Sequence, residues 1–135
     1  MRVFIDSNIP MYVAGRQHPN RDPARRFLER VQASEIEGCT STEVLQEILY
    51  RYSALHRLDL ARAVYDLFVH VCPVVLDVTL ADTDRARDLL LGIKGISARD
   101  AVHAAVMINH RIEWIATFDV GFGKLSGIKR FDLAG

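Results

Sequence analysis

Short apolar runs alternate along this chain with longer segments whose apolar residues recur at helical spacing. Residues 2–5 (RVFI) contain three consecutive apolar side chains without alternation, which is typical of a strand buried on both faces of a parallel sheet. Further short strands are expected at 37–41, 73–77 and 113–117, with a last edge strand at 129–131. Because helical segments separate the strands, the sequence predicts an α/β layer fold with a mostly parallel sheet.

The helical segments begin at recognisable capping residues. A short helix is expected over residues 8–15, followed by five longer ones. Residues with a short polar side chain favour the N-cap position because they accept a hydrogen bond from a free backbone N–H. The expected N-caps are Asp22 (with Pro23 as the first helical residue), Ser41 or Thr42, Asp59, Thr79 and Ser97.

Composition bounds the protein class. The chain has 135 residues, of which 50% are hydrophobic and 25% charged, so a folded domain is expected rather than disorder. The 17 basic and 17 acidic residues cancel, so overall charge gives no argument about nucleic acid. Cys39 and Cys72 lack CxxC spacing and are interpreted as buried hydrophobes in a reducing cytoplasm. No apolar run reaches the roughly 18 residues that span a bilayer, and no leader is recognised, so a cytoplasmic protein without a membrane anchor is expected.

Four acidic residues fall at unusual places. Asp6 ends the first predicted strand and Asp119 follows the strand at 113–117. In parallel sheets, the carboxyl ends of the strands form the active crevice. Asp100 and Glu47 interrupt apolar helix faces, where an unpaired ion is costly. These positions predict that the four acids meet in one pocket.

Each acid alone also has an ordinary structural explanation. Asp6 can be a turn residue, Asp100 a first-turn acid favoured by the helix dipole, and Glu47 half of an ion pair with Arg51 one turn later. Together they indicate more, because clustered carboxylates do not all stay ionised without a cation. Oxygen ligands without His or Cys favour Mg²⁺ or Mn²⁺, which activate water against phosphodiesters.

The four acids lie in segments that resemble the four motifs of PIN-domain nucleases. The segments, in order, are FIDSN (4–8), the stretch from Ser41 to Glu47, ARDAVHAA (98–105) and ATFDVGF (116–122). The chain looks most like the VapC toxin ribonucleases of VapBC toxin–antitoxin pairs. The resemblance implies a single PIN-like domain over residues 1–135, with three α/β/α layers around a mostly parallel sheet. It also implies a metal-dependent endoribonuclease, a VapB-type antitoxin and a homodimer.

The resemblance also assigns roles to individual residues. Asp6, Glu47, Asp100 and Asp119 would be catalytic, with Asp6, Asp100 and Asp119 binding Mg²⁺ or Mn²⁺. Residues expected to support these carboxylates are Ser7, Asn8 and Thr117, together with Glu43, which is alternatively a capping-turn acid. Gly121 stands where many relatives carry another acid or Asn, which argues against a well-held second metal.

Other polar residues near the motifs are interpreted more simply. His103 shares a helix face with Asp100, and we interpret it as a packing histidine rather than a metal ligand. Arg99 and Arg16 are candidates for contacts with RNA phosphates. Most of the large apolar residues on the early and middle helices are expected in the core, and any surplus would suit a groove for an antitoxin helix or a second copy of the chain.

Three alternatives stay open on the sequence. One is a PIN nuclease that acts in RNA processing or on DNA, outside a toxin–antitoxin pair. A haloacid dehalogenase-like phosphatase also ends its first strand in Asp, but needs a second Asp where this chain has Asn8. A non-catalytic metal- or protein-binding module of the receiver type would have Asp77 as its phosphoacceptor, which leaves Glu47 and Asp100 unexplained.

Overall fold

The computed structural model describes residues 1–134, in which five parallel strands form one sheet of order β3-β2-β1-β4-β5. The strands are β1 (Arg2–Ile5), β2 (Glu37–Ser41), β3 (Val74–Leu76), β4 (Trp114–Ala116) and β5 (Lys129–Arg130). The helices are α1 (Asn8–Ala14), α2 (Arg21–Gln32), α3 (Thr42–Ala54), α4 (Leu58–Val71), α5 (Leu80–Gly92) and α6 (Ala98–Asn109). A 3₁₀ helix, η1 (Val120–Lys124), precedes β5. The predicted parallel α/β fold is therefore confirmed.

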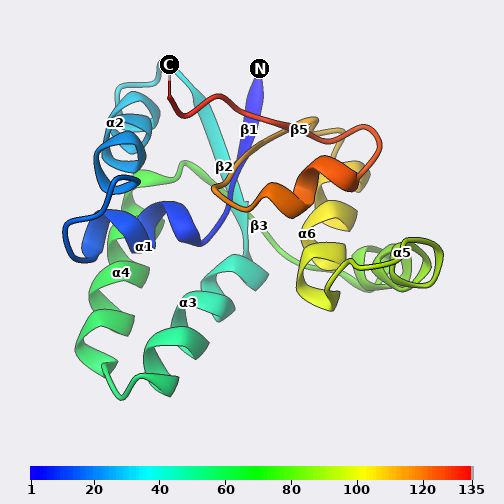
Figure 1. Ribbon diagram of the computed structural model, residues 1–135, viewed down its shortest axis with the longest axis horizontal. Coiled ribbons are helices and arrows are strands. Elements are labelled where there is room, and N and C mark those ends of the chain that lie inside the picture. The colour runs from blue at the N-terminus through cyan, green and yellow to red at the C-terminus, as the bar shows by residue number, and fades with distance from the viewer. Residues whose placement is uncertain (135) are drawn as a thin grey trace.

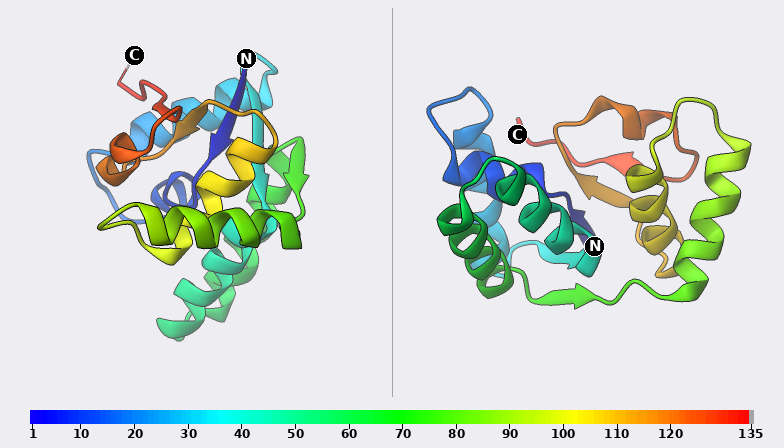
Figure 2. Two further views of the ribbon diagram at one scale, coloured as in Figure 1. Left: turned by 90° about the vertical axis from the view of Figure 1, so that its right-hand side faces the viewer. Right: turned by 90° about the horizontal axis from the view of Figure 1, so that it is seen from below.

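The helices form two layers around the sheet. Helices α1 to α4 gather on one side, and α5 and α6 lie together on the other (Figures 1 and 2). This division follows from the strand order, because the chain moves from β1 through β2 to β3 in one direction and then returns to β4 and β5. Right-handed crossovers place the connecting helices on opposite faces when the direction of travel reverses. The result is a three-layer α/β/α fold.

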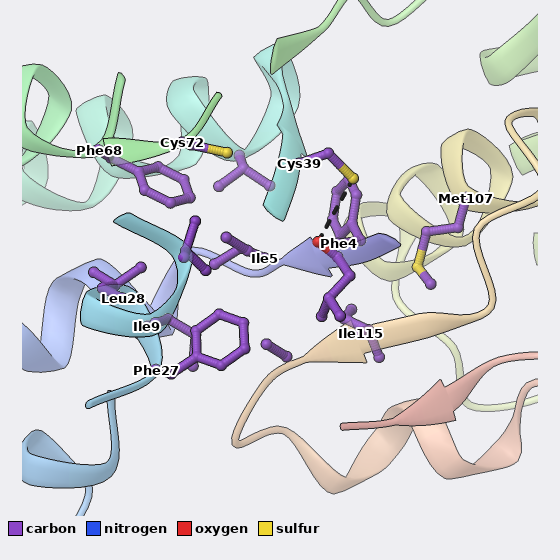
Figure 3. Close-up of a cluster of buried hydrophobic side chains, with 14 of the residues drawn as sticks. Phe4, Ile5, Ile9, Phe27, Leu28, Cys39, Phe68, Cys72, Met107 and Ile115 are labelled. Carbon is purple, nitrogen blue, oxygen red and sulfur yellow. Dashed lines mark hydrogen bonds between the residues drawn. The ribbon is translucent and has the colours of Figure 1, made fainter. Parts of the chain in front are cut away.

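Strand β1 lies at the centre of the sheet and is buried on both faces. Val3, Phe4 and Ile5 have no solvent exposure. Figure 3 shows Ile5 on the side of Leu28 and Phe4 on the side of Met107. The close packing on the Ile5 side depends on Gly38 of β2, because a Cβ there would lie 2.9 Å from Ile5 Cδ1. The apolar segment at 2–5 thus forms the buried strand that its pattern predicts.

Two of the predicted N-caps are wrong. Helix α2 begins after Asn20, so Asp22 and Pro23 lie inside its first turn. The first backbone N–H groups of a helix have no intrahelical partner, so a proline there sacrifices no hydrogen bond. Asp59 also lies within its helix, α4, where its carboxylate accepts a hydrogen bond from Arg57 Nε at 3.1 Å.

The other predicted helix starts are confirmed. The Thr79 hydroxyl accepts a hydrogen bond from the Asp82 N–H at 3.3 Å, and the Ser97 hydroxyl accepts one from the Asp100 N–H at 3.1 Å. Ser41 is the N-cap of α3 by position, although its hydroxyl makes no capping bond. Cys39 and Cys72 are both buried free thiols, as expected. Within residues 1–134, no helix combines the length and the apolar character required to cross a membrane.

Candidate active site

The site lies where the strand order reverses. β1 pairs with β2 on one side and β4 on the other, and the chain leaves β1 and β4 side by side, since Ile5 pairs with Ala116. The Asp6 N–H donates to the Ala116 carbonyl at 3.1 Å. Such switch points leave a crevice outside the carboxyl ends of the strands. Asp6 and Asp119 are therefore delivered to the same opening.

A cavity of about 650 Å³ occupies this crevice. All four predicted carboxylates line it: Asp6, Glu47, Asp100 and Asp119. The predicted residues Ser7, Asn8, Arg16 and Arg99 line it as well. Glu43 does not. It faces a smaller hollow that shares Arg99, and within residues 1–134 no hydrogen bond or ion pair joins its side chain to the four carboxylates.

A backbone N–H and a hydroxyl hold the Asp6 carboxylate. Its Oδ1 accepts the Ser7 N–H at 2.7 Å, and its Oδ2 accepts the Thr117 hydroxyl at 2.7 Å. Thr117 Oγ1 also accepts hydrogen bonds from Asn8 Nδ2 at 3.1 Å and from the Asp119 N–H at 3.0 Å. A threonine hydroxyl offers one donor and two acceptor positions, and this one uses all three. Thr117 thus connects β1, α1 and the start of the Asp119 turn.

Glu47 contacts a hydroxyl, an arginine and a histidine. The Ser7 hydroxyl donates to its Oε2 at 2.5 Å, and Arg99 Nη1 lies 3.6 Å from the same oxygen. His103 Nε2 lies 3.2 Å from its Oε1. Burial alone would raise the pKa of Glu47, but hydrogen bonds from His103 and Ser7 and the charge of Arg99 lower it below its ordinary value. The charge partner of Glu47 is therefore Arg99 of α6, not Arg51 one turn away.

Asp100 and Asp119 are held less tightly. The pKa of Asp100 is raised, first by burial and then by the negative charge of Asp119, with a smaller contribution from Asp6. Asp119 lies at the N-cap of η1 and accepts the Gly121 N–H at 2.8 Å. The pKa of Asp6 is raised as well, chiefly by burial. These carboxylates crowd together, which is the electrostatic situation that a bound cation relieves.

His103 belongs to the same cluster, which the sequence did not reveal. Its ring is fully buried, with centroids 5.7 Å from Phe4 and 6.5 Å from Phe122. Its Nε2 nevertheless points to Glu47 and lies 3.9 Å from Asp6 Oδ1. Burial alone would lower the pKa of His103, but the hydrogen bond to Glu47 and the charge of Asp6 raise it. The packing interpretation therefore explains the buried ring of His103 but not the contacts of its Nε2 with Glu47 and Asp6.

Comparisons with known proteins identify the family. Residues 3–128 match the PIN domain. The ribonuclease VapC13 of Mycobacterium tuberculosis is 42% identical over 128 residues, which cover 95% of this chain and 98% of VapC13. This chain belongs to the VapC family of PIN-domain proteins.

Solved structures share the fold. The M. tuberculosis VapC20 structure, described as a sarcin–ricin loop cleaving toxin, has a TM-score of 0.72 at 22% identity, with 90% of this chain and 92% of that chain covered. The VapBC2 structure from Rickettsia felis, bound to a promoter DNA fragment, has a TM-score of 0.75 at 19% identity, with coverage of 98% and 100%. At these identities, both structures support the VapC fold itself.

The donor set of this VapC-family site fits a hard divalent cation. Asp6, Asp100 and Asp119 offer carboxylate oxygens, the ligands that Mg²⁺ and Mn²⁺ prefer. Glu47 is already engaged by Ser7, Arg99 and His103, so it is less available as a ligand. Among residues 1–134, the group of three potential ligand side chains whose ligand atoms all lie within 4.8 Å of one another is Asp6, Glu47 and His103, without Asp100 or Asp119. The softer imidazole makes this grouping less suited to Mg²⁺.

Proposed function

We propose that this VapC-family protein is a Mg²⁺- or Mn²⁺-dependent endoribonuclease toxin that hydrolyses RNA phosphodiester bonds with a metal-activated water. One observation carries the proposal: four acids from four separate segments line one open cavity at the switch point of a PIN fold. The ribonuclease name of VapC13, and the sarcin–ricin loop that VapC20 cleaves, support RNA as the substrate.

The residues around the cavity would have different roles in catalysis. Asp6, Asp100 and Asp119 would hold the cation, while Ser7 and Thr117 fix the orientation of the Asp6 carboxylate. When bound, the cation polarises a phosphate oxygen and lowers the pKa of a coordinated water. Its partners lower the pKa of Glu47 and keep it charged, so it is a weak base. We assign to it the role of holding Arg99 in place.

The arginine that Glu47 anchors suits a contact with the scissile phosphate. The Arg99 side chain is 46% exposed, whereas that of Glu47 is 9% exposed. One face of the guanidinium is therefore free for a phosphate while the Glu47 contact fixes its position. Arg16 lies at another part of the cavity wall and would contact a neighbouring phosphate.

The proposal includes protein partners. The R. felis structure is of a VapBC pair, which supports a VapB-type antitoxin for this chain. Several apolar side chains of α3 and of the start of α4 are exposed, and they provide a surface for the antitoxin or for a second copy in a homodimer: Leu49, Tyr50, Leu55 and Leu58. Light scattering on the protein alone and with its antitoxin tests both assemblies.

The nuclease activity is tested directly with purified, antitoxin-free protein. Structured RNA, single-stranded RNA and single-stranded DNA are incubated with Mg²⁺, Mn²⁺ or EDTA. We expect metal-dependent cleavage of RNA that Asp100→Asn reduces at least about 100-fold, since removal of a ligand and its charge affects the transition state directly. Asp77→Asn, an exposed acid outside the cavity, is the matched control and should cleave normally.

Two results would contradict the proposal. Equal cleavage by Asp100→Asn and the native protein would place the activity elsewhere or in a contaminant. Cleavage of DNA in preference to RNA would replace the toxin ribonuclease with a DNA-directed PIN nuclease.

A further inference from the structure

The cavity extends well beyond the four carboxylates. Its far part reaches the loop between α1 and α2 and the C-terminal half of α3, where Tyr12, Arg16, His18, Arg51, Tyr52 and Leu55 line it. A volume of about 650 Å³ exceeds what a cation and one phosphate group require, and it falls in the range of pockets that enclose small organic molecules. We call this far part the distal half of the cavity.

Two neighbouring rings, tilted against each other, form one wall of the distal half. The ring centroids of Tyr12 and His18 are 4.7 Å apart with an interplanar angle of 35°. Phe118 supports Tyr12 edge-on, with centroids 5.2 Å apart. His18 Nδ1 accepts the Asn20 N–H at 3.0 Å, which fixes the imidazole although the residue is exposed. His18 is exposed at this wall, and an exposed ring held in place is a surface on which an unpaired base can stack.

The charge of the distal half is opposite to that of the carboxylate end. The acids that line the cavity are the four at the switch point, so the distal half contributes only basic and neutral side chains. Arg16 and Arg51 are exposed there, and within residues 1–134 neither forms an ion pair. In contrast, Arg57 at the N-cap of α4 and Arg62 within α4 pair with acids of that helix. Unpaired guanidinium groups beside a stacking surface suit the phosphates that flank a nucleobase.

We propose that the distal half binds one unpaired nucleobase of the RNA, stacked against the Tyr12–His18 pair, with Arg16 and Arg51 on its flanking phosphates. This inference rests on the proposed ribonuclease function and adds to it a base-binding part of the cavity at these four residues. In a duplex, both faces of each base are covered by stacking, so a paired base has no free face to offer. Continuity of the distal half with the carboxylates places the bound base next to the scissile phosphate.

Binding is measured separately from cleavage, in the Asp100→Asn background. The probe is a fluorescent single-stranded 12-nucleotide RNA of mixed sequence, compared with the same RNA fully paired. His18→Ala removes an exposed ring, and we expect it to weaken single-stranded binding about tenfold, the size of one base–aromatic contact. Duplex binding should stay unchanged. His70→Ala, an exposed histidine of α4 outside the cavity, is the matched control.

Further variants separate the ring from the charges. Tyr12→Phe keeps the ring and should bind normally, whereas Tyr12→Leu should bind about as weakly as His18→Ala. Arg51→Gln should weaken single-stranded binding and reduce its salt dependence, and Arg26→Gln, an exposed arginine of α2, should not. A 2-aminopurine in the RNA should lose fluorescence on binding to the parent protein and less so to His18→Ala.

Unchanged single-stranded binding by His18→Ala and Tyr12→Leu would overturn the inference, as would equal affinity for the duplex. These outcomes differ from failure of the proposed function, which appears as absent or Asp100-independent cleavage. If RNA is cut normally by His18→Ala while antitoxin binding is lost, the surface belongs to the protein partner and the inference is wrong.

Discussion

At the residue scale, two hydroxyl-bearing residues position the acids of the site. Ser7 donates its backbone N–H to Asp6 and its hydroxyl to Glu47, so one residue holds two carboxylates. Thr117 holds Asp6 and at the same time accepts from Asn8 and from the backbone of Asp119. Asp100 lacks comparable support and its pKa is raised. Asp6 and Glu47 are therefore held by hydrogen bonds that Asp100 lacks, although burial raises the pKa of Asp6 as well as that of Asp100.

Thr117→Val tests this division. Valine has nearly the shape of threonine, but it removes the donor to Asp6 and the acceptor for the Asp119 N–H at a fully buried position. We expect Mn²⁺ affinity and RNA cleavage to fall by about 10- to 100-fold, as for other groups that orient metal ligands. Isothermal titration with Mn²⁺ measures the affinity. Thr83→Val removes an exposed hydroxyl of α5 and is the control. Native affinity in Thr117→Val would show that Asp6 needs no such support.

The sequence allowed the four acids to be selected, because each interrupts an apolar pattern or ends a strand. It did not reveal the role of His103, since a histidine among Ala and Val looks the same whether its nitrogen meets a carboxylate or not. It also did not decide whether Glu43 takes part in the site together with Glu47, because residues four apart share a helix face. Only the direction in which α3 leaves the sheet decides that Glu47 reaches the cavity and Glu43 does not.

At the scale of the elements, α5 and α6 are joined through a buried carboxylate. Asp82 accepts the Thr79 N–H at 2.9 Å in a capping box, and Asn109 Nδ2 of α6 donates to it at 2.8 Å. Burial alone would raise the pKa of Asp82, but these hydrogen bonds lower it below its ordinary value of 3.8. The lowered pKa means that the folded protein binds this proton more weakly than the unfolded chain does.

Asp82→Asn should therefore destabilise the protein in a pH-dependent way. The contribution of Asp82 is complete above the unfolded pKa and is lost as the pH falls through the lower folded value. We expect the variant to lose about 1–2 kcal/mol of unfolding free energy at pH 7, typical of a lost cap. The loss should shrink below about pH 3.8. Urea unfolding across this pH range measures it, with exposed Asp84→Asn as the control. A pH-independent loss would assign the effect to packing rather than to charge.

The element boundaries show what local patterns do and do not determine. Thr79 and Ser97 were predictable as N-caps because threonine and serine favour that position, and both side chains accept the capping hydrogen bond. Asp22 and Asp59 were each assigned as N-caps two residues too late, because an acid is equally favourable inside the first turn of a helix. The parallel sheet was predictable from buried strands that alternate with helices, but its strand order depends on contacts between distant segments.

At the scale of the whole molecule, the reversal of strand order creates the site. The chain builds α1 to α4 on one face and α5 and α6 on the other (Figure 1). The cavity lies at the carboxyl ends of β1 and β4. Asp6 and Asp119 reach it from the sheet, Glu47 from one layer and Asp100 from the other. Each of the acids is supplied by a different part of the fold, so the site exists only in the folded chain.

The central claim is that these converging acids form one divalent-metal site. A Mn²⁺ titration followed by electron paramagnetic resonance, which reports free Mn²⁺, tests it most directly. The account predicts binding by the native protein and by Asp77→Asn, and at least about tenfold weaker binding by Asp100→Asn, since one of three carboxylate ligands is lost. Affinity should rise with pH, because the raised pKa of Asp100 makes protons compete with the metal. Native-like binding by Asp100→Asn, or no binding by the native protein, would contradict the account.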